Sequence, residues 1–329
     1  MTLALATPWL MPRTAAAEGD PSRDSGELHL PSPSDVVTAR PAGGPQAGAS
    51  FDTVEGHAFD GELRDTSGSS MSSSSLYARL ALRVPVGERL VLSFPLDAAV
   101  SFYAFNGNPL LLPGGGAPWD QVRSFSVGVQ GRYRVNERWA LIGAADVASA
   151  GARGASFGDT LSQGGTLGFS YALARGLTLG AGVTVQSQLV GGLYVIPFPV
   201  IDWVLPFDGG RWRLAAGAVQ ASAARTASAS LLYTPSPSLT FNVSIAAPGL
   251  GREFRLSSSG PIASGVGRDS ASPLTMGLEL RPMKALTCSL YGGVNILHTV
   301  TVLDGAGNTL EQRDVKPSPV LGGRISLAF

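Results

Sequence analysis

The final stretch of the sequence, Pro319-Val-Leu-Gly-Gly-Arg-Ile-Ser-Leu-Ala-Phe329, shows a clear alternating pattern. Every second residue from Leu321 to Phe329 is apolar or glycine, and the residues between them are mostly small, with one charge at Arg324. In a β-strand these two sets lie on opposite faces. An apolar edge strand in a soluble sheet invites aggregation, whereas a closed barrel has no free edge and a membrane covers its apolar face. The stretch therefore favours a membrane β-barrel, with a half-buried strand of a soluble sheet as the alternative.

The same stretch resembles the C-terminal signature strand of bacterial outer-membrane β-barrels. In that signature a final Phe follows apolar residues at alternate positions and is recognised by the barrel assembly machinery. The resemblance implies that this machinery is a partner of the chain. It also implies an assembly signal made of Leu321, Ile325, Leu327 and Phe329.

Composition supports a membrane protein without spanning helices. Charged residues make up 15% of the chain, against about 25% in soluble globular proteins. No apolar run reaches the roughly 18 residues that a spanning helix needs, and the nearest candidate, 193–207, is interrupted by three prolines. The net charge is zero, so nothing points to nucleic acid as a partner. The single cysteine, Cys288, excludes an intrachain disulfide.

The N-terminal passage reads as a targeting segment followed by a linker. Residues 1–17 are apolar and end on Ala15-Ala16-Ala17, which is typical of a secretory signal and its cleavage site. No basic residue precedes Arg13, so we expect the true start to lie upstream. Residues 18–50 are rich in Pro, Ser and Gly and predict a disordered linker, too short for a plug domain. The barrel is expected at 51–329.

Within 51–329, residues alternate between apolar and small or polar, as in 90–102, which is long enough to cross a membrane at barrel tilt. Tight turns near positions 86, 136, 175, 208, 236 and 283 alternate with longer connections near 60–73, 106–119, 151–163, 249–271 and 304–315. This sorting is typical of outer-membrane barrels. Six turns that each join two strands, plus one strand at each end, predict a single antiparallel up-and-down barrel of 14 strands, with 12 or 16 as alternatives.

Large aromatic residues collect beside the tight turns. Interfacial aromatic girdles mark the two edges of the lipid-covered band of a barrel. The sequence therefore predicts a periplasmic girdle, with core aromatics of a soluble sheet as the alternative. Its predicted members are Tyr133, Trp139, Trp203, Trp212 and Tyr233.

Four segments resemble a bacterial family of uncharacterised outer-membrane proteins. They are Gly131-Arg-Tyr-Arg-Val-Asn-Glu-Arg-Trp139, Gly165-Thr-Leu-Gly-Phe-Ser-Tyr171, Ile196-Pro-Phe-Pro-Val-Ile-Asp-Trp203 and Ser230-Leu-Leu-Tyr-Thr-Pro-Ser236. The resemblance covers about 120–329 and implies a Gram-negative bacterium and the cell outer membrane, with outer-membrane lipid as a partner. The family has no assigned activity, so no functional residue follows from it.

The face opposite the apolar one carries charges that a barrel would direct into its lumen. These charges predict either a constriction that selects solutes or internal salt bridges that fill the barrel. Inward glycines such as Gly128, Gly168, Gly180 and Gly182 would leave space, whereas a pair between Asp97 and Arg132 would bridge the lumen. The candidate lumen-facing charges are Arg79, Arg83, Asp97, Arg132, Arg134, Asp146, Glu279, Arg281 and Arg324.

Catalytic and metal chemistry finds little support. His29 falls in the linker and His57 in an uncertain first strand, while His298 and Cys288 share the parity of the lipid-facing residues. No nucleophile motif, Cys/His spacing or phosphate-binding glycine loop is present, so no enzyme, cofactor or metal is expected. We expect a porin-like passive pore for small polar solutes. The alternatives are a closed structural or adhesive barrel whose loops bind a partner, and, with less support, a membrane phospholipase.

Overall fold

A computed structural model describes residues 47–66, 68–109, 111–112, 116–221, 224–247, 251–260 and 262–329. The predicted signal segment, His29 and all but the last residues of the predicted linker lie outside these ranges. The first strand, β1 (Gly48–Glu62), begins slightly before the predicted start of the barrel at 51.

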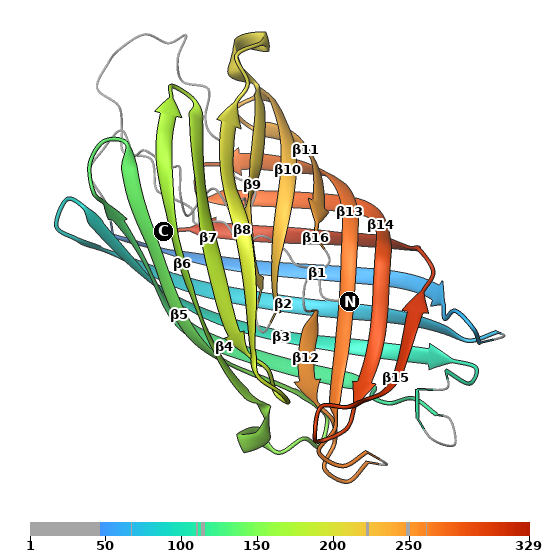
Figure 1. Cartoon of the computed structure of the whole chain (residues 1–329). Helices are drawn as coiled ribbons and strands as arrows, with labels where there is room; N and C mark the ends of the chain where they lie inside the picture. Colours follow the sequence, from blue (N-terminus) through green and yellow to red (C-terminus); the bar gives the residue numbers. More distant parts are fainter. Residues whose placement is uncertain are drawn as a thin grey trace.

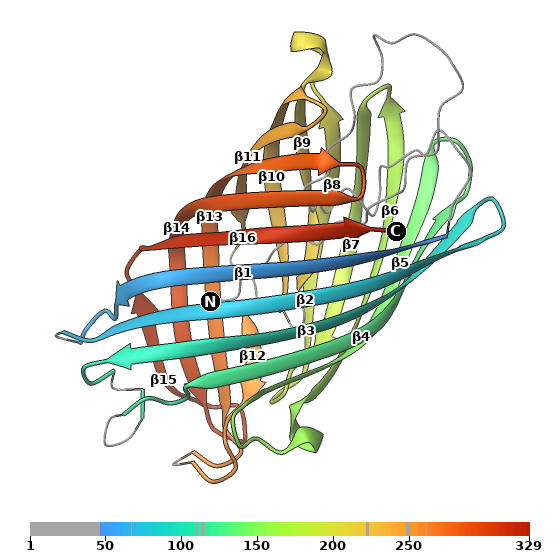
Figure 2. The ribbon, with the colours of Figure 1, turned by 180° about the vertical axis from the view of Figure 1, so that it is seen from behind.

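Fourteen strands form a closed antiparallel barrel, which confirms the predicted fold and strand number (Figure 1). Each strand pairs with the next, and β16 pairs with β1 to close the ring, as Figure 2 shows from behind. After β1, the barrel strands are β2 (Ser70–Val86), β3 (Leu90–Asn106), β4 (Gln121–Arg134), β5 (Trp139–Ala152), β6 (Leu161–Ala174), β7 (Leu177–Ser187), β8 (Leu193–Val204), β9 (Trp212–Ala221), β10 (Ala224–Ser236), β11 (Leu239–Ala246), β13 (Val266–Met283), β14 (Leu286–Leu303) and β16 (Ser318–Ala328).

Two further strands lie in segments that the sequence predicted as loops. β15 (Thr309–Val315) pairs with the end of β14 and extends the line of β16 beyond Lys316 and Pro317. β12 (Arg252–Arg255) pairs antiparallel with the start of β13 and also forms a parallel bridge from Arg255 to Gly151 of β5. β5 and β13 are far apart around the barrel, so β12 joins two separate parts of the wall.

The helical content of the described residues is limited to two short 3-10 turns, Phe157–Thr160 and Asp208–Gly210. Among the residues that the structure describes, no helix is long and apolar enough to cross a membrane.

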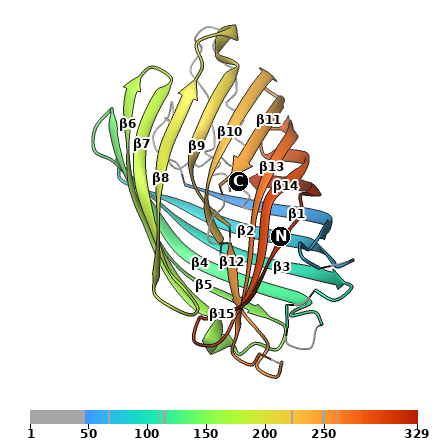
Figure 3. The same cartoon turned by 45° about the vertical axis from the view of Figure 1, so that its right-hand side comes forward.

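The barrel has two different ends. The six connections predicted as tight turns lie at one end; five of them are two to four residues long, whereas the one near 208 has seven residues, 205–211. The first residues of β1 lie at the same end, as does Phe329, which exchanges backbone hydrogen bonds with Ala49; we call this the short-turn end. The opposite end, the loop end, carries the longer connections. One of its connections, 188–192, is shorter than the connection 205–211 at the short-turn end, so the predicted sorting by length holds only in part. Figure 3 shows the strands converging towards the loop end.

An apolar core lies at the loop end, where side chains from both sides of the barrel meet. Four of its aromatic residues, Tyr103, Phe105, Trp119 and Phe254, pack with ring centroids 4.8–6.4 Å apart. Phe254 belongs to β12 and is fully buried. The buried members of this loop-end core are Leu63, Met71, Tyr103, Leu111, Trp119, Val122, Ala148, Ala150, Ala152, Phe254, Leu256, Val300, Val302 and Val315.

The outer face of the wall is apolar and exposed, as the alternation predicted. On β2, for example, Leu76, Leu80 and Leu82 are 41–50% exposed, while Tyr77 and Arg79 between them are buried. Successive residues of a strand point to opposite faces, so the second set lines the inside. An exposed apolar belt of this extent is typical of a surface that lipid covers.

Candidate functional site: the lumen

A row of charged and polar side chains lies across four neighbouring strands on the inner face of the wall. Asp52, Arg79, Asp97 and Ser126 are direct cross-strand neighbours on β1 to β4. Arg79 Nε lies 3.5 Å from Asp97 Oδ1, and Ser126 donates to Asp97 Oδ2 at 3.0 Å. We call these residues, together with Tyr77 and Arg324, the wall row. Tyr77 donates to Asp97 at 2.6 Å, and Arg324 donates to Asp52 at 2.5 Å.

The wall row joins neighbouring strands. Asp97 contacts Arg79 and Tyr77 of β2 and Ser126 of β4. Arg132, by contrast, pairs with Val91, six residues along β3 from Asp97. This geometry matches the salt-bridging alternative for Arg79, Asp97 and Arg324, because paired charges satisfy one another within the wall. Their effect on solute selection stays a prediction.

The other predicted lumen charges are spread over different levels. Arg132 lies within electrostatic range of Arg83 and Arg134, which forms a positive group near the short-turn end. Arg134 itself is exposed and donates to the carbonyl oxygen of Glu88 in the adjacent turn. The remaining three lie on the walls of β5 and β13: Asp146 is partly buried opposite Gly128, Glu279 is buried opposite Thr240, and Arg281 is partly buried.

A second group of polar residues crosses the lumen next to the loop-end core, on its side towards the short-turn end. Tyr103 of β3 donates to Asp269 Oδ2 of β13 at 2.8 Å, and His298 Nε2 of β14 lies 2.7 Å from Asp269 Oδ1. Arg252 of β12 donates to Ser101 Oγ of β3 at 2.7 Å. Since β3 is not a sheet neighbour of β12, β13 or β14, these bonds tie opposite parts of the wall together. We call the five residues the crossing layer.

The position predicted for His298 was wrong. The sequence placed it with the lipid-facing residues, but its side chain is 4% exposed and contacts Asp269 inside the barrel. The reason is a β-bulge: Ser272 pairs with Leu297 while Pro273 pairs with Asn295, so Ile296 is an extra residue. One extra residue reverses the face of every later side chain in the strand. Cys288, which precedes the bulge, is a free thiol of intermediate exposure.

A serine–histidine contact that the sequence analysis missed lies on the outer face. His57 Nδ1 and Ser74 Oγ are 2.8 Å apart across β1 and β2, and the His57 ring packs edge-on against Phe59. A hydrolase would need a third group to orient the histidine. No carboxylate contact of His57 appears in the part of the chain that the structure describes, so the pair is explained as two polar groups that satisfy each other.

The predicted aromatic residues do lie at the short-turn end. Trp139 packs on Tyr171 at 4.8 Å and Trp212 on Tyr233 at 4.6 Å between ring centroids, while Tyr133 and Trp203 are exposed beside neighbouring turns. Of the predicted assembly signal, Leu321, Ile325 and Phe329 are exposed on the outer face of β16 and just beyond it. The membrane and assembly roles of both groups stay predictions.

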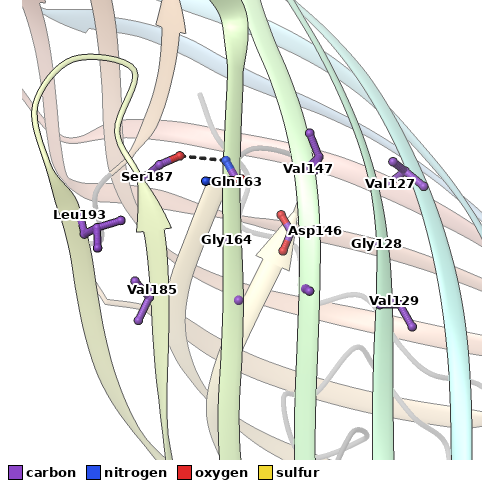
Figure 4. A pocket seen from close by; sticks show the side chains of 12 residues that line it. Val127, Gly128, Val129, Asp146, Val147, Gln163, Gly164, Val185, Ser187 and Leu193 are labelled. Carbon is purple, nitrogen blue, oxygen red and sulfur yellow. Dashed lines mark hydrogen bonds between the residues drawn. The ribbon is translucent and has the colours of Figure 1, made fainter.

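A groove of about 600 Å³ lies on the wall formed by β4 to β8 (Figure 4). Its sides include the exposed Val127, Val147 and Leu193, and small residues such as Gly165 form its floor. At one point Ser187 Oγ accepts a hydrogen bond from the backbone N–H of Gln163. Most of its lining belongs to the apolar outer face, so the groove is not part of the polar lumen.

Metal binding finds no support among the described residues, because none of them form a group of three or more His, Cys, Asp or Glu side chains that could hold an ion.

The candidate site consists of a polar lumen, the wall row and the crossing layer, all inside a closed barrel. These features define an outer-membrane-type β-barrel of 14 strands.

Comparison with known proteins gives the same class. No family model matches the chain, and no curated protein matches its sequence. Solved structures do match: a deltaS2 mutant of the monoaromatic hydrocarbon channel TodX has 13% identity and a TM-score of 0.52, covering 91% of this chain and 93% of its own. The Pseudomonas putida toluene transporter TodX has 11% identity and a TM-score of 0.50, covering 90% of this chain and 91% of its own. At these identities the likeness is one of fold.

Proposed function

We propose that this protein is a passive channel for small polar solutes in the bacterial outer membrane. The observation that carries the proposal is the contrast between the two faces of one closed wall. The outer face exposes large apolar side chains, whereas the inner face holds the wall row and the crossing layer. A lumen lined by polar groups and surrounded by lipid is the arrangement through which barrels pass solutes.

The filled loop end means that the proposed channel needs an opening movement. The loop-end core and β12 fill the barrel where the strands converge, so the channel is closed there in this conformation. β12 is only four residues long, bridges to β5 through one residue pair and is also held by hydrogen bonds of Arg252 and Arg255, so the path opens when these contacts break. The proposed channel therefore conducts when the β12 contact opens.

Planar-bilayer recording of the purified, folded protein tests the proposal. We expect brief single-channel openings in the wild type, because the loop end is closed most of the time. We also expect Arg132→Ala to reduce preference for anions, because it removes a charge from the positive group near the short-turn end. An Asp120→Ala variant is the control for the effect of any charge change, since Asp120 is exposed on a loop.

The second candidate function is a closed structural or adhesive barrel, and the filled loop end is the observation that favours it. The two functions differ in conductance. If neither the wild type nor a variant with a loosened loop end conducts, while both migrate as folded, heat-modifiable protein, the channel proposal fails and the closed barrel takes its place.

A further inference from the structure

The guanidinium of Arg252 has an unused hydrogen-bonding edge inside the barrel. The side chain is 4% exposed and lies in the crossing layer, below the aromatic residues of the loop-end core. Its Nη1 donates to Ser101 Oγ, but Nε and Nη2 have no hydrogen-bond partner among the described residues. Arginine stays protonated in proteins, and buried donors that lack an acceptor are costly. An acceptor that the described residues do not supply is therefore expected at this edge.

The free edge is the one that binds carboxylates in this same molecule. Arg213 donates from Nε to Asp202 Oδ1 at 2.6 Å and from Nη2 to Asp202 Oδ2 at 3.1 Å. Such paired bonds from a planar fork suit the two oxygens of a carboxylate. Arg252 presents the same two nitrogens without that partner. Its cross-strand neighbour Asp269 directs its oxygens to Tyr103 and His298 instead.

The residues around Arg252 further restrict the chemical class of ligand that fits there. Phe254 lies two residues along β12 on the same face, and its ring is 6.4 Å from that of Tyr103. Aromatic side chains of this kind favour an apolar or aromatic ligand body. The nearby carboxylate of Asp269 opposes a second negative charge on the ligand, which disfavours phosphate dianions.

From these observations we infer that the Nε–Nη2 edge of Arg252 binds the carboxylate of a small monoanionic solute with an apolar body. The inference names the solute class of the channel proposed above and rests on that proposal. It predicts a binding site at the loop end of the lumen, where Arg252 takes the carboxylate and the aromatic residues contact the rest of the ligand.

Calorimetric titration of the folded wild-type protein in detergent tests the ligand class directly. Benzoate is the probe, benzamide and toluene are uncharged analogues of similar size, and inorganic phosphate tests for a general oxoanion site. We expect benzoate to bind at least about tenfold more tightly than benzamide, because the amide offers one neutral acceptor oxygen in place of two charged ones and turns an N–H2 donor towards the second guanidinium nitrogen. Equal affinity for benzoate and benzamide, or tighter binding of phosphate than of benzoate, would overturn the inference.

Substitutions of Arg252 test whether this residue is responsible for benzoate binding. Arg252→Gln should weaken benzoate binding by about tenfold or more, and Arg252→Lys should give an intermediate loss because the charge remains without the fork. Arg153→Gln is the matched control: it removes the same charge from an exposed pair with Asp120 at the same end of the barrel, and should leave the affinity unchanged. Wild-type affinity in Arg252→Gln contradicts the assignment.

The two proposals fail in different ways. Conductance without benzoate binding would overturn only the ligand class. Benzoate binding without conductance in any variant would overturn the channel and leave the site at Arg252. If the Arg252 variants do not fold, the comparison of benzoate with benzamide on the wild type decides the inference alone.

Discussion

Inward-facing glycines in this barrel make room for aromatic side chains of the neighbouring strand. A Cβ on Gly182 would come within 2.3 Å of the Phe198 ring, which lies directly across in the register and is buried. The same arrangement recurs at two other cross-strand pairs, Gly267 with Phe254 and Gly322 with Tyr291. Glycine in a strand often marks such a close approach. The prediction that Gly182 leaves free space in the lumen was wrong, because the Phe198 ring that fills this space comes from another strand.

The buried carboxylate of Asp97 provides a residue-scale prediction. Asp97→Ala removes the shared partner of Arg79, Tyr77 and Ser126 and leaves the wall row with two arginines, Arg79 and Arg324, for the one carboxylate of Asp52. Loss of one partner of a buried pair costs about 3–5 kcal/mol. We therefore expect the free energy of unfolding to fall by about that amount in urea titrations of the lipid-embedded protein, followed by tryptophan fluorescence.

Asp120→Ala is the control for this experiment. Asp120 pairs with Arg153 on the surface, with both side chains more than half exposed. Exposed pairs contribute about 0–1 kcal/mol. An Asp97→Ala variant no less stable than Asp120→Ala would show that the wall row does not hold the strands together.

At the scale of elements, β12 is the part of the barrel whose removal should change function most. Phe254 is its buried contact with the aromatic residues of the loop-end core, and Arg255 holds it by donating to the carbonyl oxygens of Asp159, Ser264 and Leu189. Phe254→Ala should loosen the closure, so we expect longer openings and a larger mean current in planar bilayers. Truncation of a buried aromatic costs about 3–5 kcal/mol, which this short strand cannot recover elsewhere.

Phe198→Ala is the matched control, because it also removes a buried inward ring but lies in β8, away from the loop end. If both variants raise the current equally, the effect reflects general destabilisation. If Phe254→Ala leaves the current unchanged while folding normally, β12 is not the closure.

The last strand provides a second prediction at this scale. β16 pairs with both β14 and β1, so barrel closure depends on it. Leu327→Lys places a charge on the face predicted to meet lipid, and deletion of Phe329 removes the terminal aromatic of the predicted assembly signal. A lipid-facing charge costs up to about 2–4 kcal/mol in such barrels, depending on depth. We expect both variants to reduce the amount of heat-modifiable protein in membrane fractions, with Ala328→Ser as the control. Wild-type levels in both would contradict the assembly role.

Most strands of this barrel could be predicted from sequence because they alternate within themselves, whereas prolines interrupt 193–207 and the first strand was uncertain. The short turns were equally readable, since each is a local feature. β12 and β15 could not be predicted: both are short, and β12 in particular exists through its partners on β5 and β13. The bulge at Ile296 could not be predicted from the sequence either, because an extra residue in β14 is recognised only when its pairing with the neighbouring strand β13 is known. The crossing layer was missed for the same reason, since its residues come from β3, β12, β13 and β14.

The whole molecule is asymmetric along the barrel axis. The loop end holds an apolar core like that of a soluble domain, while the positive group around Arg132 lies near the short-turn end. The first residues of β1 and Phe329 lie together at the short-turn end. A solute that enters from the loop end therefore meets the β12 closure and Arg252 first, then the wall row, and last the positive group.

This asymmetry makes the orientation in the membrane a testable consequence. We expect the loop end to face the outside, because longer connections of outer-membrane barrels are external and tight turns are periplasmic. A protease recognition site inserted at Ala306, in the exposed connection between β14 and β15, should be cut in intact cells. The same site inserted between Pro237 and Ser238, in the turn between β10 and β11, should be cut only after the outer membrane is permeabilised. Cutting of the turn site alone in intact cells would reverse the orientation and place Arg252 and the β12 closure on the periplasmic side.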